Sequence, residues 1–199
     1  MRHISALALT LCLGLTFTHA QDCVPYDRAL YKHWVDSDKD GIKTRDEVLQ
    51  EESLIPATIV SNKVTKGKWH DPYTNTDFTD PKKLDVDHLV PLSEAHASGG
   101  WAWDKNRRQG YANYLVLKNH LISVDLSANR AKGDKDPAEW LPGNVAYRKQ
   151  YVKDWCDVKA RWKMTADTAE VRAIKEVLGE KQSKIWLKYV KVAEEQKCD

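Results

Sequence analysis

The segment of residues 85–133 constrains the fold of this chain most, because it predicts two short strands and a helix in a fixed order. Residues 86–90 favour a strand, which Pro91 ends because proline cannot continue a paired strand. The second strand is expected within residues 112–124, and a helix over 124–132 ends at a glycine. The polar side chains of this segment therefore lie on two strands and on the helix that follows them.

Residue types that suit phosphodiester hydrolysis occur along this segment. Asp87 directly precedes His88, and Asn129 lies in the predicted helix. Carboxylate and amide oxygens are hard ligands, so Asp87 and Asn129 favour Mg²⁺ (or Mn²⁺) over Zn²⁺. A histidine near its ordinary pKa is largely neutral at pH 7 and can accept a proton from water. Neighbouring residues of a strand point to opposite faces, so Asp87 and His88 act at one point only if the backbone twists.

This order and spacing resemble the HNH, or His-Me finger (ββα-metal), endonucleases, and above all a secreted family among them. The resemblance rests on the stretches DVDHLVPL (residues 85–92) and NRAKGDKDPAEWLP (residues 129–142) and extends from about Tyr26 to about Glu176. It implies an α+β fold with a ββα-metal core, a short β-sheet, several flanking helices and an all-helical C-terminal part. One nuclease domain would span residues 21–199, with its core at about 58–142 and C-terminal helices over 144–197.

The resemblance also assigns roles to individual residues. It implies that Asp87 and Asn129 hold the metal and that His88 activates water. The middle position of the motif falls on Asn119 or His120, and the nine-residue spacing to Asn129 favours His120 as the catalytic residue. By the same resemblance, Lys132 takes a basic position that contacts phosphate or stabilises the transition state.

Basic residues near the motif are the expected nucleic-acid contacts. The whole chain carries a net charge of only +2, so attraction to phosphate must come from local clustering. Substrate binding is expected from Arg107, Arg108 and Arg130. No DNA-reading motif is present, so we expect a nuclease for DNA, or also RNA, with little sequence specificity.

The N-terminal residues 1–20 have the pattern of a secretory signal peptide. Arg2 is followed by an apolar run that is too short to span a bilayer, and Ala20 offers a small residue for cleavage. We therefore expect a secreted or periplasmic monomer without a membrane partner.

Cys23, Cys156 and Cys198 would remain after cleavage, which predicts one disulfide and one free thiol. Members of the secreted family carry cysteines at the position of Ile42 and near Lys149, and this chain has neither. The resemblance therefore suggests Cys23–Cys198 as the substitute pair.

A second motif, over residues 36–47, fits a calcium-binding loop. Acidic side chains stand at the first, third, fifth and twelfth places, and a glycine at the sixth. These acidic residues are Asp36, Asp38, Asp40 and Glu47. Against calcium, the apolar Ile42 lies one place earlier than in an EF-hand. The alternative is an Asp-rich turn that caps the helix expected at Thr44.

The remaining segments are predicted from periodicity and capping residues. We expect helices over residues 26–34, 44–54 (with a Thr44–Glu47 capping box), from Asp136, after Pro142, and over 165–178 and 183–196; a strand over 58–65; and a loop over 67–80.

Two functions remain open from the sequence. The first is a secreted, Mg²⁺-dependent nuclease. The second is a non-catalytic, calcium-stabilised binding protein built on a nuclease scaffold. The intact set of Asp87, His88, Asn129 and Lys132 favours the first.

Overall fold

The computed structural model describes residues 23–194, which form a mixed α and β structure with small sheets. Its helices are α1 (Thr44–Glu51), α2 (Leu92–Ala97), α3 (Lys105–Ala112), α4 (Leu126–Lys132), α5 (Arg148–Trp162), α6 (Thr168–Leu178) and α7 (Glu180–Leu187), with 3₁₀ turns η1 (Arg28–Leu30), η2 (Pro81–Lys83) and η3 (Gly100–Ala102).

Eight short strands in the described residues pair two by two. They are β1 (Thr58–Val60), β2 (Lys63–Lys66), β3 (Trp69–Asp71), β4 (Thr76–Phe78), β5 (Leu84–His88), β6 (Leu121–Asp125), β7 (Thr165–Ala166) and β8 (Lys191–Val192). The pairs β1–β2, β3–β4 and β5–β6 are antiparallel, whereas β7–β8 is parallel.

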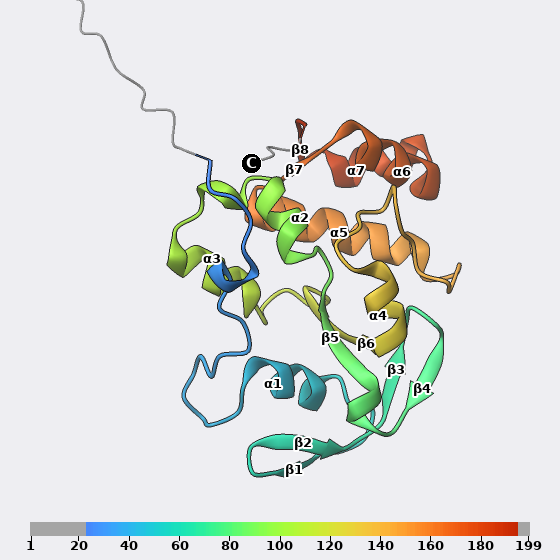
Figure 1. Ribbon diagram of the computed structural model, residues 1–199. Coiled ribbons are helices and arrows are strands. Elements are labelled where there is room, and N and C mark those ends of the chain that lie inside the picture. The colour runs from blue at the N-terminus through green and yellow to red at the C-terminus, as the bar shows by residue number, and fades with distance from the viewer. Residues whose placement is uncertain (1–22, 195–199) are drawn as a thin grey trace, which may run out of the picture.

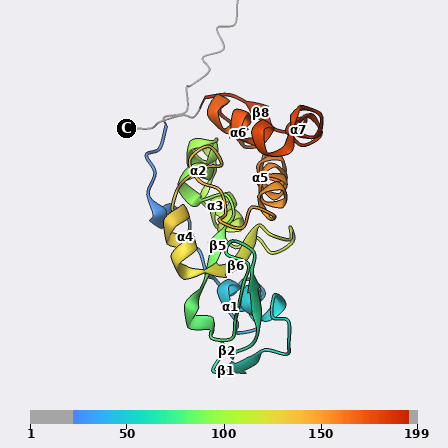
Figure 2. The ribbon, with the colours of Figure 1, turned by 90° about the vertical axis from the view of Figure 1, so that its right-hand side faces the viewer.

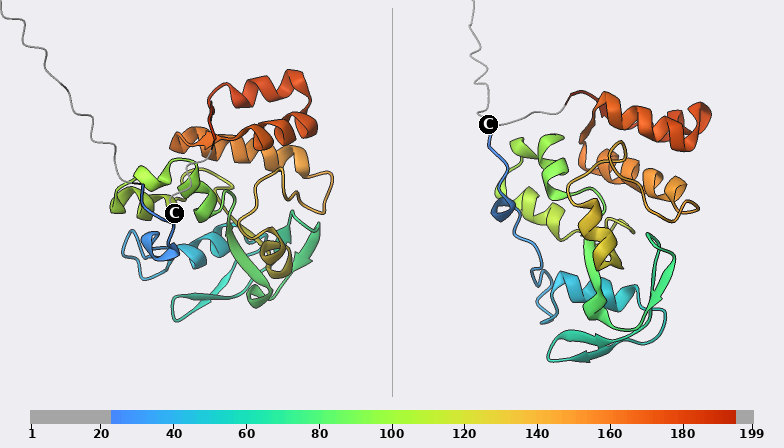
Figure 3. Two further views of the ribbon diagram at one scale, coloured as in Figure 1. Left: turned by 45° about the horizontal axis from the view of Figure 1, so that its top comes forward. Right: turned by 45° about the vertical axis from the view of Figure 1, so that its right-hand side comes forward.

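The elements are arranged around the β5–β6 pair (Figure 1). Helices α5, α6 and α7 stack at one end of the molecule, and α1 with the β1–β2 hairpin lies at the other (Figures 1 and 2). Helix α4 follows β6 directly and packs on both β5 and β6. The right-hand view of Figure 3 shows α2 and α3 (light green) at the level of α5 (orange) and across from it.

The central segment has the predicted order of strand, strand and helix. In the β5–β6 register, Asp87 pairs with Ile122 and His88 with Leu121. The Asp125 carboxylate accepts a hydrogen bond of 2.8 Å from Ala128 N and so caps the start of α4. Gly133, at φ 55°, ends the helix.

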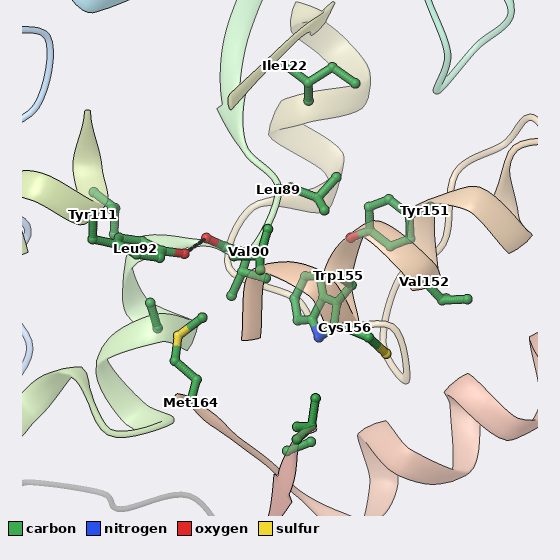
Figure 4. Packing of buried hydrophobic residues seen from close by; sticks show 14 of the residues in the cluster. Leu89, Val90, Leu92, Tyr111, Ile122, Tyr151, Val152, Trp155, Cys156 and Met164 are labelled. Atoms are coloured by element: carbon green, nitrogen blue, oxygen red, sulfur yellow. Dashed lines mark hydrogen bonds between the residues drawn. The ribbon is translucent and has the colours of Figure 1, made fainter. Parts of the chain in front are cut away.

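Two hydrophobic clusters lie on either side of the β5–β6 pair. The larger one packs Ile122 and Leu89 against the aromatic face of α5, with Tyr151 and Trp155 fully buried (Figure 4). The smaller one packs Val86 with residues of α1, β2 and β3. Both faces of the pair are therefore covered. This fixes its register, because a one-residue slip would move every side chain of the slipped strand to the opposite face.

Several sequence expectations outside the central segment are wrong. Residues 26–34 contain only the turn η1 instead of a helix, and residues 67–80 form the β3–β4 hairpin instead of a loop. The residue before α1 is Lys43 and makes no side-chain cap. Thr44 instead donates its hydroxyl to the Val35 carbonyl, 2.7 Å away, so the predicted capping box is absent.

The C-terminal part is also less helical than expected. Residues 165–166 and 191–192 pair as β7 and β8, so this part is not all helical. At Asp136 the chain makes a turn instead of a helix, in which the carboxylate accepts from Ala138 N at 2.5 Å.

Cys23 is disulfide-bonded and Cys156 is a buried free thiol, as the count predicts. The predicted partner Cys198 and the predicted signal peptide lie outside the described residues. Between residues 23 and 194, no helix has the length and apolar character needed to cross a membrane.

Candidate active site

The two faces of β5 carry different chemistry. Asp85 and Asp87 share one face with their register partners Val124 and Ile122, because side chains alternate along a strand. His88 points to the other face. The predicted acid and base therefore do not converge through their strand geometry alone.

On the α4 side, Asp87 is held in a buried network. Its carboxylate accepts a hydrogen bond of 2.7 Å from the Tyr73 hydroxyl. The Lys132 ammonium lies 3.0 Å from Asp87 Oδ1 and 2.9 Å from Oδ2. Lys132 also donates to the His88 carbonyl at 3.1 Å. This lysine is 0% exposed, so it holds Asp87 and the end of β5 and is not accessible for the phosphate contact that the resemblance implies; a role in stabilising the transition state stays a prediction.

Burial dominates the ionisation of this pair. It raises the pKa of Asp87, although the Lys132 charge acts in the opposite direction. It lowers the pKa of Lys132, although Asp87 acts in the opposite direction. Both shifts disfavour the charged forms, so the ion pair is only partly compensated for its loss of water.

Asn129 contacts Asp85 instead of Asp87. The Asn129 amide donates to Asp85 Oδ2 at 3.2 Å. This contact joins the partly exposed middle of α4 to β5 at a position two residues before Asp87. Asp85 was not singled out from the sequence, although its period-two spacing from Asp87 was a usable signal.

His88 is fixed by a backbone acceptor and by aromatic rings. Its Nε2 lies 2.9 Å from the Ala112 carbonyl oxygen, which can only accept, so Nε2 carries the proton. The ring stacks on Trp34 at a centroid distance of 5.3 Å and lies parallel to Tyr111 at 6.4 Å. Burial lowers the pKa of His88 well below its ordinary value, so the imidazole is neutral at pH 7 and Nδ1 has a free lone pair.

His120 supports the same backbone segment. Its Nε2 donates to the Tyr111 carbonyl at 2.8 Å, one residue before the carbonyl that holds His88. Its own carbonyl accepts Leu89 N at 3.1 Å, which extends the β5–β6 pairing past His88. Burial lowers the pKa of His120 to about 4. Asn119, the alternative for this position, instead donates to Asp154 Oδ2 at 3.0 Å.

The three arginines predicted to bind substrate differ in whether their guanidinium groups are free to contact it. Arg108 is buried and donates to the carbonyls of Gly100 and Trp101, at 3.3 and 2.8 Å, so its guanidinium is used within the fold. Arg107 is exposed, although it donates to the Trp162 carbonyl at 2.8 Å. Arg130 is exposed on α4, next to Asn129.

The acidic loop of residues 36–47 is distant from β5 in the sequence. It follows Trp34, whose ring stacks on His88. Ligand atoms of Asp36, Asp38 and Asp40 all lie within 4.8 Å of one another. This loop and the β5–α4 face are thus two separate groups of oxygen donors.

Comparisons with known proteins place the chain in a family. The family model of the GmrSD restriction endonucleases, C-terminal domain, matches residues 40–177. A protein of Arthroderma benhamiae, described as an uncharacterized secreted protein, is 32% identical over 174 residues, which are 87% of this chain and 84% of that protein. No solved structure matches the chain significantly. The family match covers more than half of the chain and includes β5, β6 and α4, and the chain belongs to the family of the GmrSD restriction endonuclease C-terminal domain.

Proposed function

We propose that the protein is an exported, divalent-metal-dependent HNH endonuclease that hydrolyses phosphodiester bonds of DNA, with RNA as an alternative substrate and with little sequence specificity. The observation that carries this proposal is the end of β5. There, two carboxylates and the amide of α4 lie on one face, and a neutral, oriented histidine ends the strand.

His88 is the proposed general base. Since Nε2 is committed to the Ala112 carbonyl, Nδ1 is the nitrogen that accepts the proton of an attacking water. The low pKa keeps the base unprotonated at working pH, at the cost of reduced basicity. Trp34 and Tyr111 restrict the ring to one orientation, which preserves the direction of the lone pair. His120 is a positioning residue, because it fixes the neighbouring carbonyl and Leu89.

The donor set of the α4 face fits a hard divalent cation. Asp87 and Asn129 are the proposed ligands of Mg²⁺ or Mn²⁺, and Asp85 lies beside Asn129 as a further oxygen donor. A cation bound there would screen the phosphate charge and stabilise the leaving oxygen. Rotation of the Asn129 amide would turn its oxygen toward the space that its nitrogen now faces.

Lys132 and Tyr73 orient Asp87 in this scheme. The ammonium and the hydroxyl together hold the carboxylate from two sides. The same lysine holds the His88 carbonyl, so the acid and the base share one support. On the outside, Arg130 and Arg107 are the proposed phosphate contacts, whereas Arg108 is left out because its guanidinium is engaged.

A cleavage assay with the purified mature chain tests the proposal. Plasmid DNA and single-stranded RNA are incubated with Mg²⁺, and in parallel with EDTA. We expect metal-dependent cleavage and a rate loss on the order of 10²–10⁴ in His88→Ala, because the base is removed. His70→Ala is the matched control, since His70 is an exposed histidine paired with Asp77 on the β3–β4 hairpin.

The metal assignment is tested by the same assay. Asn129→Ala should require a higher Mg²⁺ concentration, and added Mg²⁺ should partly restore its rate. His88→Ala should not be restored in this way. A wild-type chain that cleaves no substrate under any metal would favour the alternative, a non-catalytic calcium-stabilised binding protein, and full activity in His88→Ala would remove the base assignment.

A further inference from the structure

The loop that precedes α1 carries an unusual density of negative charge. Asp36, Asp38 and Asp40 present ligand atoms within 4.8 Å of one another. None of the ion pairs within residues 23–194 involves these three residues or Glu47. The described structure therefore gives this group of carboxylates no neutralising side chain.

The aspartates shape the loop with one oxygen each. Asp36 Oδ2 accepts Gly41 N at 3.0 Å, Asp38 Oδ1 accepts Asp40 N at 3.2 Å, and Asp40 Oδ1 accepts Ile42 N at 2.7 Å. Gly41 adopts φ 94°, and a Cβ there would lie 2.8 Å from the Asn62 side chain. The turn therefore requires glycine, and its backbone is built without using the second oxygen of each carboxylate.

Two of the unused oxygens are enclosed. Asp36 Oδ1 and Glu47 Oε2 are shielded from solvent and have no hydrogen-bond partner among residues 23–194. An enclosed carboxylate oxygen without a partner is costly, so each such atom in a folded protein needs an explanation. Like charges at this separation repel one another, and the ligand atoms of Asp36, Asp38 and Asp40 lie within 4.8 Å of one another. A cation between them would resolve both the repulsion and the missing partners.

We propose that this loop binds one Ca²⁺ ion, held by carboxylate oxygens of Asp36, Asp38, Asp40 and Glu47. Oxygen donors at the first, third, fifth and twelfth places, with glycine at the sixth, provide the irregular set of oxygens that calcium accepts. In this pattern the seventh place, here Ile42, contributes a backbone carbonyl. Mg²⁺ requires a tighter octahedral shell and is a poor substitute in such a loop.

The position of the loop gives the ion a structural consequence. Val35 joins Asp36 to Trp34, and its carbonyl accepts both the amide and the hydroxyl of Thr44, at 3.0 and 2.7 Å. Its amide donates to Asn113 Oδ1 at 3.0 Å. An ion that ties Asp36 to Glu47 of α1 therefore also fixes Trp34, which stacks on His88. This consequence for the nuclease site rests on the proposed function, whereas the binding of calcium does not.

Calorimetric titration of the chelator-stripped mature chain with CaCl₂ tests the site. We expect one bound Ca²⁺ and, at about one hundred times the Kd, a melting temperature higher by about 5 °C, because the ion binds the folded state. Asp38→Asn with Asp40→Asn should abolish both effects, since the amide oxygens can still close the turns but carry no charge. Glu51→Gln with Glu139→Gln removes two exposed charges elsewhere and should change neither effect.

Three further results separate the outcomes. Glu47→Gln leaves all three aspartates in place and should weaken Ca²⁺ binding at least tenfold. This variant replaces the double variant if the double variant does not fold. Asn129→Ala should keep the calcium signal. A titration without Ca²⁺ heat, or a signal that survives in the double variant and disappears in Asn129→Ala, would overturn the proposal. Neither result depends on whether the chain cleaves DNA, because the readouts are binding and melting.

Discussion

Two fully enclosed lysines, Lys132 at β5 and Lys159 in α5, are surrounded very differently. Lys159 donates to Glu94 at 2.5 Å and to Glu170 at 2.6 Å, and also to the Ser98 hydroxyl and the Thr165 carbonyl. Lys132 has one carboxylate, Asp87, and one carbonyl. Both ammonium groups are removed from water, but Lys159 is paired with two carboxylates and Lys132 with only one.

The direction of the pKa shifts expresses this difference. Burial lowers the pKa of Lys159, yet Glu94 and Glu170 together outweigh it, so the pKa is raised. At Lys132 burial prevails over the single Asp87, so the pKa is lowered. The two carboxylates therefore compensate the charge of Lys159, whereas Asp87 alone compensates that of Lys132 only in part.

The largest effect is expected from removing the lysine of the core cluster. Lys159→Met leaves two buried carboxylates without a counter-charge and should reduce the free energy of unfolding by about 3–5 kcal/mol. Urea denaturation measures it, with Lys149→Met, an exposed lysine of the same helix, as the control. A loss below about 1 kcal/mol would mean that this cluster is not the stabilising centre that its contacts indicate.

A smaller effect is expected from the lysine of the candidate site. Lys132→Met should cost about 1–3 kcal/mol, because Asp87 keeps the Tyr73 hydroxyl and its raised pKa allows it to take up a proton. Cleavage should nevertheless fall, since the support of Asp87 and of the His88 carbonyl is lost.

The comparison fails if Lys132→Met loses as much stability as Lys159→Met and retains full cleavage. Lys135→Met is the control in this case. Lys135 is exposed just after α4, and its ammonium donates to the Ala131 carbonyl at 2.7 Å.

The central segment could be predicted from the sequence because its signals are local. Pro91 ends the run that contains β5, Asp125 caps α4 and Gly133 ends it. The β3–β4 hairpin could not be predicted from its Asp, Asn, Thr and Pro residues, because tertiary packing stabilises it: Trp69 is fully buried and donates its indole N–H to the Leu49 carbonyl at 2.7 Å. Helix α3 was missed although Asp104 caps it, since its sequence is strongly polar.

The sequence could predict which residues form the candidate site, but not which of them contact one another. The sequence singles out Asp87, His88 and Asn129, yet only the structure places Asn129 beside Asp85. Nothing in the sequence connects Tyr73 to Asp87, because they lie fourteen positions apart, across a hairpin and a turn. The burial of Lys132 was equally hidden, since a lysine in a helix is usually exposed.

The last expected effect is the pH dependence of stability that the core cluster causes, and it distinguishes this cluster from the candidate site. Burial raises the pKa of Glu170 to about 7, although Lys159 opposes this, whereas an unfolded glutamate titrates near pH 4.5. The folded state therefore holds more protons than the unfolded state between these values. By linkage, this contribution to stability is fully present below about pH 4.5 and is lost as the pH rises through about 7. Glu170→Gln should remove this part of the pH dependence, while Lys132→Met should leave it in place. Urea unfolding of both variants between pH 5 and 8 measures the difference. If the Glu170 variant keeps the wild-type slope, the proton is bound elsewhere, and the contrast between the two lysines would rest on their contacts alone.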